Sequence, residues 1–214
     1  MSNFGCSHLR VVNPYEPAFR EARSAVGAAG LLNHAEEYKS VAEAIADRTL
    51  VIGTTALQHR ELQHPLRTLS AAALLIRRQL SSKSGRVALL FGSEKRGLSN
   101  EDLSHCHWLL RIPTREEHGS MNVAQAVAVC LYELVRAPNT KAGPEKLRLA
   151  TAGDLERLST VLFDALHLSG YVKRGSEAST REKLRRMVRR LHLEASDAEL
   201  WLGMLRKILW KLRG

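Results

Sequence analysis

The chain has 214 residues, 44% of them hydrophobic, and a formal net charge of +10 at pH 7. This length is enough to bury a sizeable core, whereas apolar runs such as Ala71–Ile76 are far shorter than the roughly 20 residues of a membrane-spanning helix. The composition therefore excludes a helical membrane protein, and the basic charge favours a polyanionic partner. The N-terminus lacks the apolar core of a signal peptide, so we expect a cytoplasmic protein.

The first half of the chain alternates between short apolar segments and helical patterns. The apolar segments predict strands at Leu9–Val12, Thr49–Gly53, Val87–Phe91 and Trp108–Ile112. The intervening patterns predict helices near Pro17–Leu31, Val41–Asp47 and Pro65–Leu80. Strands that alternate with helices are typical of an α/β fold, in which helices cover both faces of a parallel sheet.

The third predicted strand ends in a polar loop. Val87–Phe91 is followed by Gly92, a residue that lets backbone approach a ligand closely. The loop Ser93–Gly97 supplies hydrogen-bond donors and one carboxylate. Ser99 and Asp102 then have the spacing of a helix N-cap. We therefore expect a ligand site where this strand ends.

The fourth predicted strand leads into an apolar helix. Trp108–Ile112 is closed by Pro113, and a polar loop then reaches Ser120, where a helix to about Val135 is predicted. Apolar residues cover several faces of that helix: Ala124, Ala126, Val127, Ala128, Val129, Leu131 and Leu134. Such a helix is predicted to lie at the centre of its domain.

The last third of the chain is predicted to be helical only. Pro138, Asn139 and Gly143 break the preceding helix, so the pattern divides the chain into a domain at 1–137, a linker at 138–146 and an extension at 147–214. Apolar residues at helical spacing predict three helices in the extension, at Leu147–Leu168, Thr180–Leu193 and Ser196–Leu212. One face of the second is predicted to be formed by Leu184, Met187, Val188 and Leu191.

That second helix is strongly basic. Between residues 181 and 190, Glu182 is the single acid among six basic residues, namely Arg181, Lys183, Arg185, Arg186, Arg189 and Arg190. We interpret the six as contacts to RNA phosphates, which would set the position of the RNA while its shape supplies the specificity. The alternative is a solvated face whose charges pair with Glu194 and Asp197, at about 0.3–0.5 kcal/mol per exposed pair.

The cysteines and neighbouring histidines do not predict a metal site. Cys6, Cys106 and Cys130 are odd in number and widely spaced, so we expect free thiols. His105, Cys106 and His107 are consecutive residues that enter a strand. Adjacent residues of a strand point to alternate sides, so the three cannot easily converge on one ion.

Three segments carry a resemblance to a known family. They are Leu90-Phe91-Gly92-Ser93-Glu94-x-x-Gly97-Leu98, then Ile112-Pro113, then Ser120-Met121-Asn122-Val123-Ala124-x-Ala126. In residue type and spacing they resemble the second and third motifs of the knotted SPOUT methyltransferases, in particular the TrmH-like RNA ribose 2′-O-methyltransferases. The segments Lys183–Met187 and Leu202–Arg206 resemble the helical extension of the TrmJ-type tRNA enzymes.

The resemblance implies a fold, a cofactor and a reaction. Such enzymes bind S-adenosylmethionine in a C-terminal trefoil knot, act as homodimers and transfer a methyl group to a ribose 2′-hydroxyl, here of tRNA and by analogy in the anticodon loop. The implied cofactor contacts are Thr54, Thr55, Leu90, Gly92, Ile112, Met121 and Ala126. The implied catalytic residues are Ser120 and Asn122, which would position the ribose or the helix start, and Glu94, which would brace its loop or accept a hydrogen bond.

The family's first motif differs from the start of this chain. That motif, a strand and an arginine-bearing helix, would precede Asn3-Phe4-Gly5. Arg20 and Arg23 follow the second strand and do not replace its arginine. We therefore expect either a start upstream of Met1 or a remnant gene, and the second possibility gives an alternative function, an RNA-binding protein with impaired catalysis.

The same residues also allow simpler interpretations. Ser120 or Asn122 can be a helix N-cap only, and Gly92 and Gly97 can be turn glycines in a loop that lacks the Gly-Lys-Ser/Thr ending of a phosphate-binding P-loop. A doubly wound enzyme that uses another nucleotide would need a glycine-rich segment after its first strand, and Val12–Tyr15 provides none.

Overall fold

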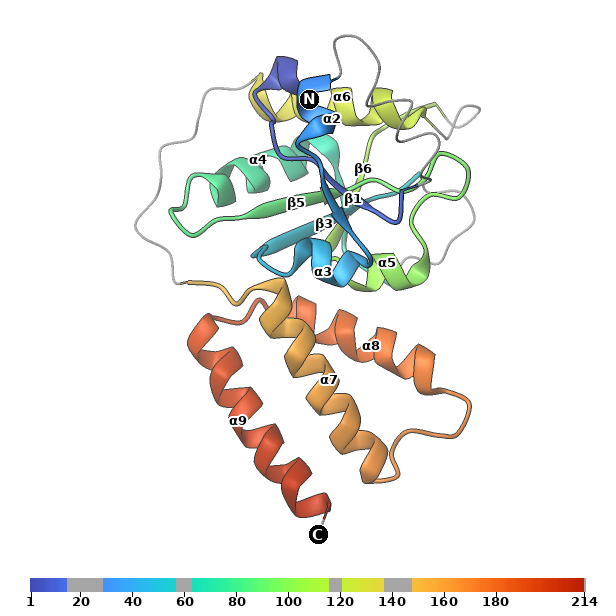
Figure 1. The fold of residues 1–214 in the computed structure, drawn as a ribbon, viewed down its shortest axis with the longest axis vertical. Coiled ribbons are helices and arrows are strands. Elements are labelled where there is room, and N and C mark those ends of the chain that lie inside the picture. The colour runs from blue at the N-terminus through green and yellow to red at the C-terminus, as the bar shows by residue number, and fades with distance from the viewer. Residues whose placement is uncertain (15–28, 57–62, 116–120, 137–147, 214) are drawn as a thin grey trace.

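The computed structural model describes residues 1–14, 29–56, 63–115, 121–136 and 148–213 (Figure 1). Its strands are β1 (Arg10–Val12), β2 (Glu36–Tyr38), β3 (Leu50–Thr54), β4 (Leu66–Thr68), β5 (Val87–Leu90) and β6 (Trp108–Arg111). Its helices are η1 (Ser2–Phe4), α2 (Ala29–Asn33), α3 (Val41–Ile45), α4 (Leu69–Leu80), α5 (Asn100–Ser104), α6 (Val123–Val135), α7 (Ala152–Leu168), α8 (Glu177–Arg190) and α9 (Ala195–Leu212).

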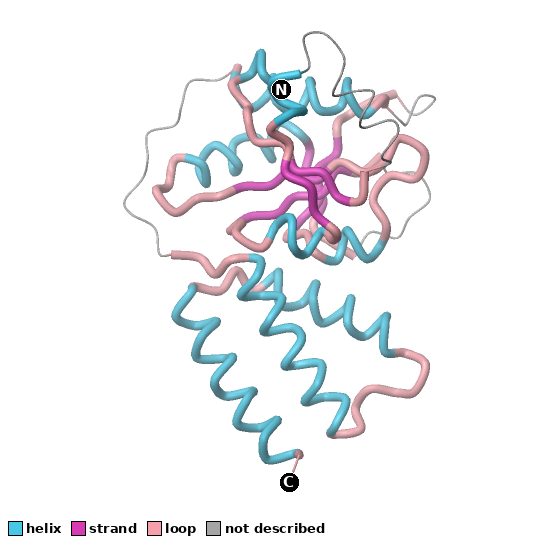
Figure 2. The backbone as a smooth tube through the Cα atoms, viewed as in Figure 1, coloured by secondary structure: helices cyan, strands magenta, loops and turns pink. Residues whose placement is uncertain are grey.

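The predicted parallel α/β sheet is confirmed. Four strands run parallel in the order β4-β6-β3-β5, and β1 and β2 form a separate parallel pair. The strands, magenta in Figure 2, lie at the centre of this part of the molecule with helices around them. In the central pair, Ile52 lies opposite Trp108 and Gly53 opposite Leu109. Because all four strands run the same way, their carboxyl ends meet at one edge of the sheet, where α/β proteins usually hold ligands.

Helices cover both faces of this sheet, as predicted. Successive strand residues point to opposite faces, so Ile52 and Leu110 pack beneath α4 and α6, while Val51 and Leu109 pack against α3 and α5 (Figure 1). Ile52, Val51 and Leu109 are fully buried. Two apolar layers therefore hold the sheet rigid from either side.

Two strands were missing from the predictions. β4 lies inside the range Pro65–Leu80 that was predicted to be helical, because Leu66–Thr68 pairs with β6 and the helix begins only at Leu69. β2, with the sequence Glu36-Glu37-Tyr38, is largely exposed and pairs with β1. Neither segment has the continuous apolar run of a central strand, so the pattern gave no signal for them.

The prediction that the helix before Val135 lies at the centre of its domain is wrong for the single chain. In α6 only Cys130 and Leu131 are buried, through a face that packs on α4, while Val129, Tyr132 and Val135 are 37%, 57% and 50% exposed. The helix also begins later than Ser120, at Val123, because Asn122 is its N-cap. Much of the apolar surface of α6 is therefore exposed rather than buried within the domain.

The C-terminal helices α8 and α9 both pack on α7, which lies between them (Figure 1). α7 begins at Ala152 rather than at the predicted Leu147, because Thr151 and Asp154 form a reciprocal capping box. The start of α7 is joined to the sheet domain: the backbone N–H of Ala152 donates to the carbonyl of Arg48 at 2.7 Å. The predicted linker at 138–146 lies outside the described residues. Among the helices of the described segments, none is long and apolar enough to span a membrane.

A buried histidine makes the fold sensitive to acid. His107 is 3% exposed, and its Nδ1 accepts a hydrogen bond from the backbone N–H of Val51 at 3.1 Å. Burial, with a smaller contribution from the nearby Arg189 guanidinium, lowers the pKa of His107 to about 3. The unfolded chain therefore binds a proton at this site below about pH 6.5, whereas the folded chain does so only near pH 3.

We expect the free energy of unfolding to fall as the pH decreases through this window. His107 alone contributes a loss on the order of 3 kcal/mol between pH 6.5 and pH 4. Urea denaturation at several pH values measures it, and His107→Gln should flatten the profile while the exposed His8→Gln should not. A wild-type pH profile in the His107→Gln protein would contradict this assignment.

Candidate functional site

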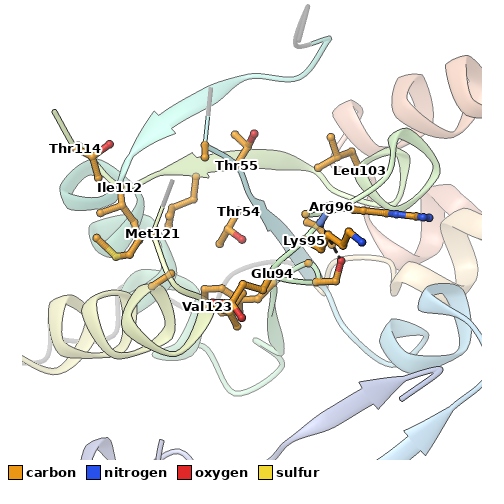
Figure 3. Close-up of a pocket in the computed structure, with 18 residues that line it drawn as sticks. Thr54, Thr55, Glu94, Lys95, Arg96, Leu103, Ile112, Thr114, Met121 and Val123 are labelled. Carbon is orange, nitrogen blue, oxygen red and sulfur yellow. Dashed lines mark hydrogen bonds between the residues drawn. The ribbon is translucent and has the colours of Figure 1, made fainter. Parts of the chain in front are cut away.

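A cavity of about 310 Å³ opens at the carboxyl ends of β3, β5 and β6 (Figure 3). Three loops and the start of α6 form its walls. Each loop follows a different strand, so residues distant in sequence share one surface. The walls include Thr54 and Thr55 after β3, Phe91 to Leu98 after β5, Ile112 and Thr114 after β6, and Met121, Val123 and Ala126 around the start of α6.

The loop after β5 is held by backbone contacts. The N–H of Gly97 donates to the carbonyl of Ser93 at 2.7 Å, which closes the loop on itself. Gly92 lies so close to the far side of the loop that a Cβ there would be 2.0 Å from the carbonyl carbon of Gly97 and 2.2 Å from the N of Leu98. Gly97 has a φ of 66°, in the left-handed region. Both glycines are thus required by the shape of the loop.

Asn122 joins this loop to α6. Its Oδ1 accepts from the N–H groups of Ala124 at 2.9 Å and Gln125 at 3.3 Å, and its Nδ2 donates to Glu94 Oε1 at 2.5 Å. Asn122 is therefore a helix N-cap, and it also fixes the carboxylate of Glu94 at the rim of the cavity. The capping interpretation of Asn122 is confirmed, and the same side chain also holds Glu94.

The two functions of Asn122 can be separated by mutation. We expect Asn122→Ala to lower the free energy of unfolding by about 1 kcal/mol, because the cap acceptor is lost. Asn122→Ser keeps a cap acceptor but is too short to reach Glu94, so it should stay within a few tenths of a kcal/mol of wild type. Urea denaturation measures both, and equal losses would show that the cap is not the source of the stability.

The structure brings most of the predicted site residues together. Thr54, Thr55, Gly92, Glu94, Ile112, Met121 and Ala126 all line the cavity. Leu90 does not line it; its side chain packs in the core, and its carbonyl accepts a hydrogen bond from Thr54 Oγ1 at 2.9 Å. Ser120 lies outside the described residues.

Some wall residues were not predicted individually. Lys95 and Arg96 line the cavity from the polar loop that was expected to form the site, and Thr114, Val123 and Leu103 of α5 line it as well. The capping box of Ser99 and Asp102 is confirmed, and it places α5 directly after the β5 loop. That signal was present in the sequence and could have identified α5 as a wall of the cavity.

The two buried cysteines near the sheet are not reactive nucleophiles. Burial raises the pKa of Cys106 to about 12 and that of Cys130 to about 11, so both thiols stay protonated. Within the ranges that the structure describes, no three His, Cys, Asp or Glu side chains form a group that could hold a metal ion.

The basic helix α8 does not present all its cations to solvent, which corrects the predicted phosphate-contacting face. Arg186 and Arg189 are 8% and 1% exposed. Arg185 points inward and bonds Glu156 and Ser104. The predicted apolar face is also partly wrong, because Met187 and Leu191 are exposed while Leu184 and Val188 are buried. Arg181, Lys183 and Arg190 remain at the surface.

Comparison with known proteins agrees with this geometry. The model of the SpoU rRNA Methylase family matches residues 1–132. The chain is 31% identical to the tRNA (cytidine/uridine-2′-O-)-methyltransferase TrmJ of Photorhabdus laumondii, over 97% of this chain and 88% of that protein. The TrmJ protein of Sodalis glossinidius is also 31% identical, over 97% of this chain and 83% of its own.

A solved structure has the same fold. The crystal structure of TrmJ from Z. mobilis ZM4 is 28% identical and superposes with a TM-score of 0.83, covering 97% of this chain and 89% of that one. The family match covers the sheet, its helices and every described loop of the cavity, and the structural match extends through the C-terminal helices. The chain therefore belongs to the SpoU rRNA methylase family.

Proposed function

We propose that this chain is an S-adenosylmethionine-dependent methyltransferase that methylates a ribose 2′-hydroxyl of tRNA. The observation that carries the proposal is the cavity at the strand ends, whose walls are the segments that resemble the family motifs. Its volume of about 310 Å³ lies within the range of small-molecule and cofactor sites. The TrmJ names of its relatives supply the substrate class.

The residues of the cavity fit such a cofactor. Ile112, Met121 and Leu103 supply apolar walls suited to a purine ring, while Thr55 and Thr114 place polar side chains beside them. Gly92 brings backbone to the wall without a side chain, and Thr54 and Ala126 complete the proposed contacts. Leu90 would act indirectly, because its carbonyl accepts the hydrogen bond of Thr54. Bound there, S-adenosylmethionine would supply an electrophilic methyl group, and no metal would be needed.

The chain's own task is then to orient the ribose and accept a proton. Asn122 holds Glu94 at the rim of the cavity, where a carboxylate can accept a hydrogen bond from an incoming hydroxyl. Lys95 and Arg96 beside it would attract the adjoining phosphates. We assign Ser120 and Asn122 to positioning the ribose, a step in which alignment accounts for much of the rate.

The RNA is proposed to extend over the C-terminal helices. Arg181, Lys183 and Arg190 are the exposed cations of α8, and they would hold the RNA backbone, with the anticodon loop delivered to the cavity. Arg185, Arg186 and Arg189 lie inside the protein, so they would not contact the RNA.

The finer architecture is also part of the proposal. β6 follows β5 in the chain but inserts between β3 and β4, an order compatible with the trefoil knot of the family. The exposed apolar face of α6, with Val129, Tyr132 and Val135, is suited to a second copy of this chain, which would make the enzyme a homodimer. We place the protein in the cytoplasm, where its tRNA substrate is found.

Calorimetric titration with S-adenosylmethionine, together with a methyl-transfer assay on bulk tRNA that detects 2′-O-methylated nucleosides, tests the proposal. We expect one cofactor per chain and methyl transfer to cytidine or uridine. Binding without transfer would favour the alternative, an RNA-binding protein with impaired catalysis. Failure to bind the cofactor would overturn the assignment of the cavity.

A further inference from the structure

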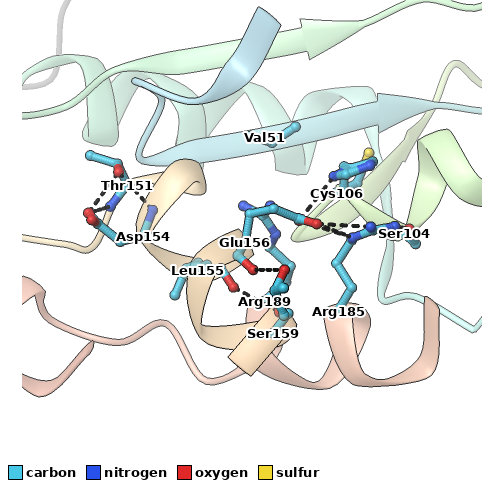
Figure 4. A network of polar contacts seen from close by, with 12 residues as sticks. Val51, Ser104, Cys106, Thr151, Asp154, Leu155, Glu156, Ser159, Arg185 and Arg189 are labelled. Carbon is cyan, nitrogen blue, oxygen red and sulfur yellow. Dashed lines mark hydrogen bonds and ion pairs between the residues drawn. The ribbon is translucent and has the colours of Figure 1, made fainter. Parts of the chain in front are cut away.

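A buried polar cluster joins the C-terminal helices to α5 (Figure 4). We call it the Glu156 cluster, and it consists of Ser104, His105, Glu156, Arg185 and Arg189. Glu156 on α7 accepts hydrogen bonds from Arg185 Nε at 3.0 and 3.1 Å and from Arg185 Nη2 at 2.9 Å. Arg189 Nη2 lies 3.4 Å and His105 Nδ1 lies 3.5 Å from the same carboxylate.

The cluster is inside the protein. Ser104 is fully buried, Arg189 is 1% exposed and His105 is 4% exposed. Partial burial disfavours the charge of Glu156, but the approach of His105 and Arg185 outweighs it and lowers the pKa of Glu156 to about 2. Such a cluster fixes geometry more firmly than exposed ion pairs, which are screened by water and salt.

Arg185 also bonds the sheet domain directly. Its Nη1 donates to Ser104 Oγ at 2.8 Å, and that hydroxyl in turn donates to the carbonyl of Glu101 at 2.6 Å. Ser104 is the last residue of α5, and the residue before it, Leu103, lines the cavity. The contact from α8 therefore ends one residue away from the cavity wall.

The opposite end of α5 supports the β5 loop. Leu98, which is 7% exposed, precedes the N-cap of α5 and lines the cavity. The backbone N of Leu98 lies against Gly92, and the loop between these two residues carries Glu94. A displacement of α5 would therefore move both the apolar wall of the cavity and the Glu94 carboxylate at its rim.

We propose that Arg185 is a positioning residue for the cofactor site: by bridging Glu156 to Ser104, α8 holds α5 and the β5 loop in the shape of the cavity. This inference rests on the proposed function for the identity of the ligand. It gives the C-terminal helices a second task besides contact with RNA, because cofactor affinity then depends on their docking.

Two variants of the bridge and one control test the inference in the full-length chain. Arg185→Met removes the bridge and Ser104→Ala removes only its far end. Arg157→Ala breaks an exposed pair with Asp154 on α7, away from α5. Titration with S-adenosylhomocysteine should show affinity about tenfold weaker for Arg185→Met, a smaller loss for Ser104→Ala and none for Arg157→Ala. Arg185→Lys, which keeps the charge next to Glu156, should recover part of the affinity.

Hydrogen exchange without any ligand separates this inference from the proposed function. Amides of α5 and of the β5 loop should lose protection in Arg185→Met and Ser104→Ala, while those of α4 keep theirs. Unchanged protection in α5, or a uniform loss across the sheet, would overturn the positioning role. If the variants lose protection as expected but the wild type does not bind S-adenosylhomocysteine, the positioning role stands and the proposed identity of the ligand is refuted.

Discussion

Gly92→Ala is expected to reduce S-adenosylmethionine affinity by at least about a hundredfold, equivalent to roughly 2.7 kcal/mol. The added Cβ would lie 2.0 Å from the carbonyl carbon of Gly97 and 2.2 Å from the N of Leu98. Both are backbone atoms, so no change of rotamer relieves the overlap, and the loop must move out of the cavity wall. Calorimetric titration measures the loss, and circular dichroism checks that the sheet remains folded.

Gly97→Ala is the matched control in the same loop. A Cβ at Gly97 meets no atom of the described residues within 4 Å, so the substitution adds the strain of a positive φ, about 1–2 kcal/mol. We expect this variant to be less stable but to bind the cofactor much more tightly than Gly92→Ala. Equal affinities in the two variants would show that general loop strain, and not the close approach at Gly92, controls binding.

Glu156→Ala should cost about 3–5 kcal/mol of folding free energy, because it leaves buried cations without a counter-charge. Arg189 is 1% exposed, and among the described residues its Nε and Nη1 have no hydrogen-bond partner even in the wild type. Burial already lowers the pKa of Arg189 to about 10 against the opposing charge of Glu156. Chemical denaturation at pH 7 measures the loss.

Two comparisons make the result for Glu156 specific. Glu133→Ala, which breaks a pair with the exposed Arg136, should change stability little. Glu156→Leu combined with Arg185→Met and Arg189→Met should recover much of the lost stability, because apolar replacement removes the desolvation cost of the whole cluster. If the single Glu156→Ala variant were as stable as Glu133→Ala, the cluster would contribute nothing to folding.

Three strands of the central sheet could be predicted from the sequence because each of them is marked by an apolar run within its own segment. Continuous apolar runs at β3, β5 and β6, each closed by a polar loop, are typical of buried parallel strands, and the structure confirms them. The edge strand β4 has no such run, and only its pairing with β6 defines it. A pattern within one segment does not contain the partner that makes the segment a strand.

The candidate site was predicted more completely than the basic helix. The cavity residues follow strand ends, whose position in a parallel sheet is fixed by topology, so Thr54, Gly92 and Ile112 converge as expected. On α8 the same reasoning assumed that charged residues face water. Arg189 is buried because Glu156, 33 positions away in the chain, supplies its counter-charge, and no spacing rule within α8 reveals that partner.

The start of α7 limits how the C-terminal helices can be transferred to another protein. The N–H groups of Ala152 and Gly153 donate to the carbonyls of Arg48 and Ala46, so the turn after α3 satisfies the first donors of α7. A chimera that grafts the C-terminal helices onto another catalytic domain would have to carry that turn and Ser104 with them. The C-terminal helices are thus bonded to the sheet domain at the start of α7 and at Ser104, so moving them as a separate module would break both connections.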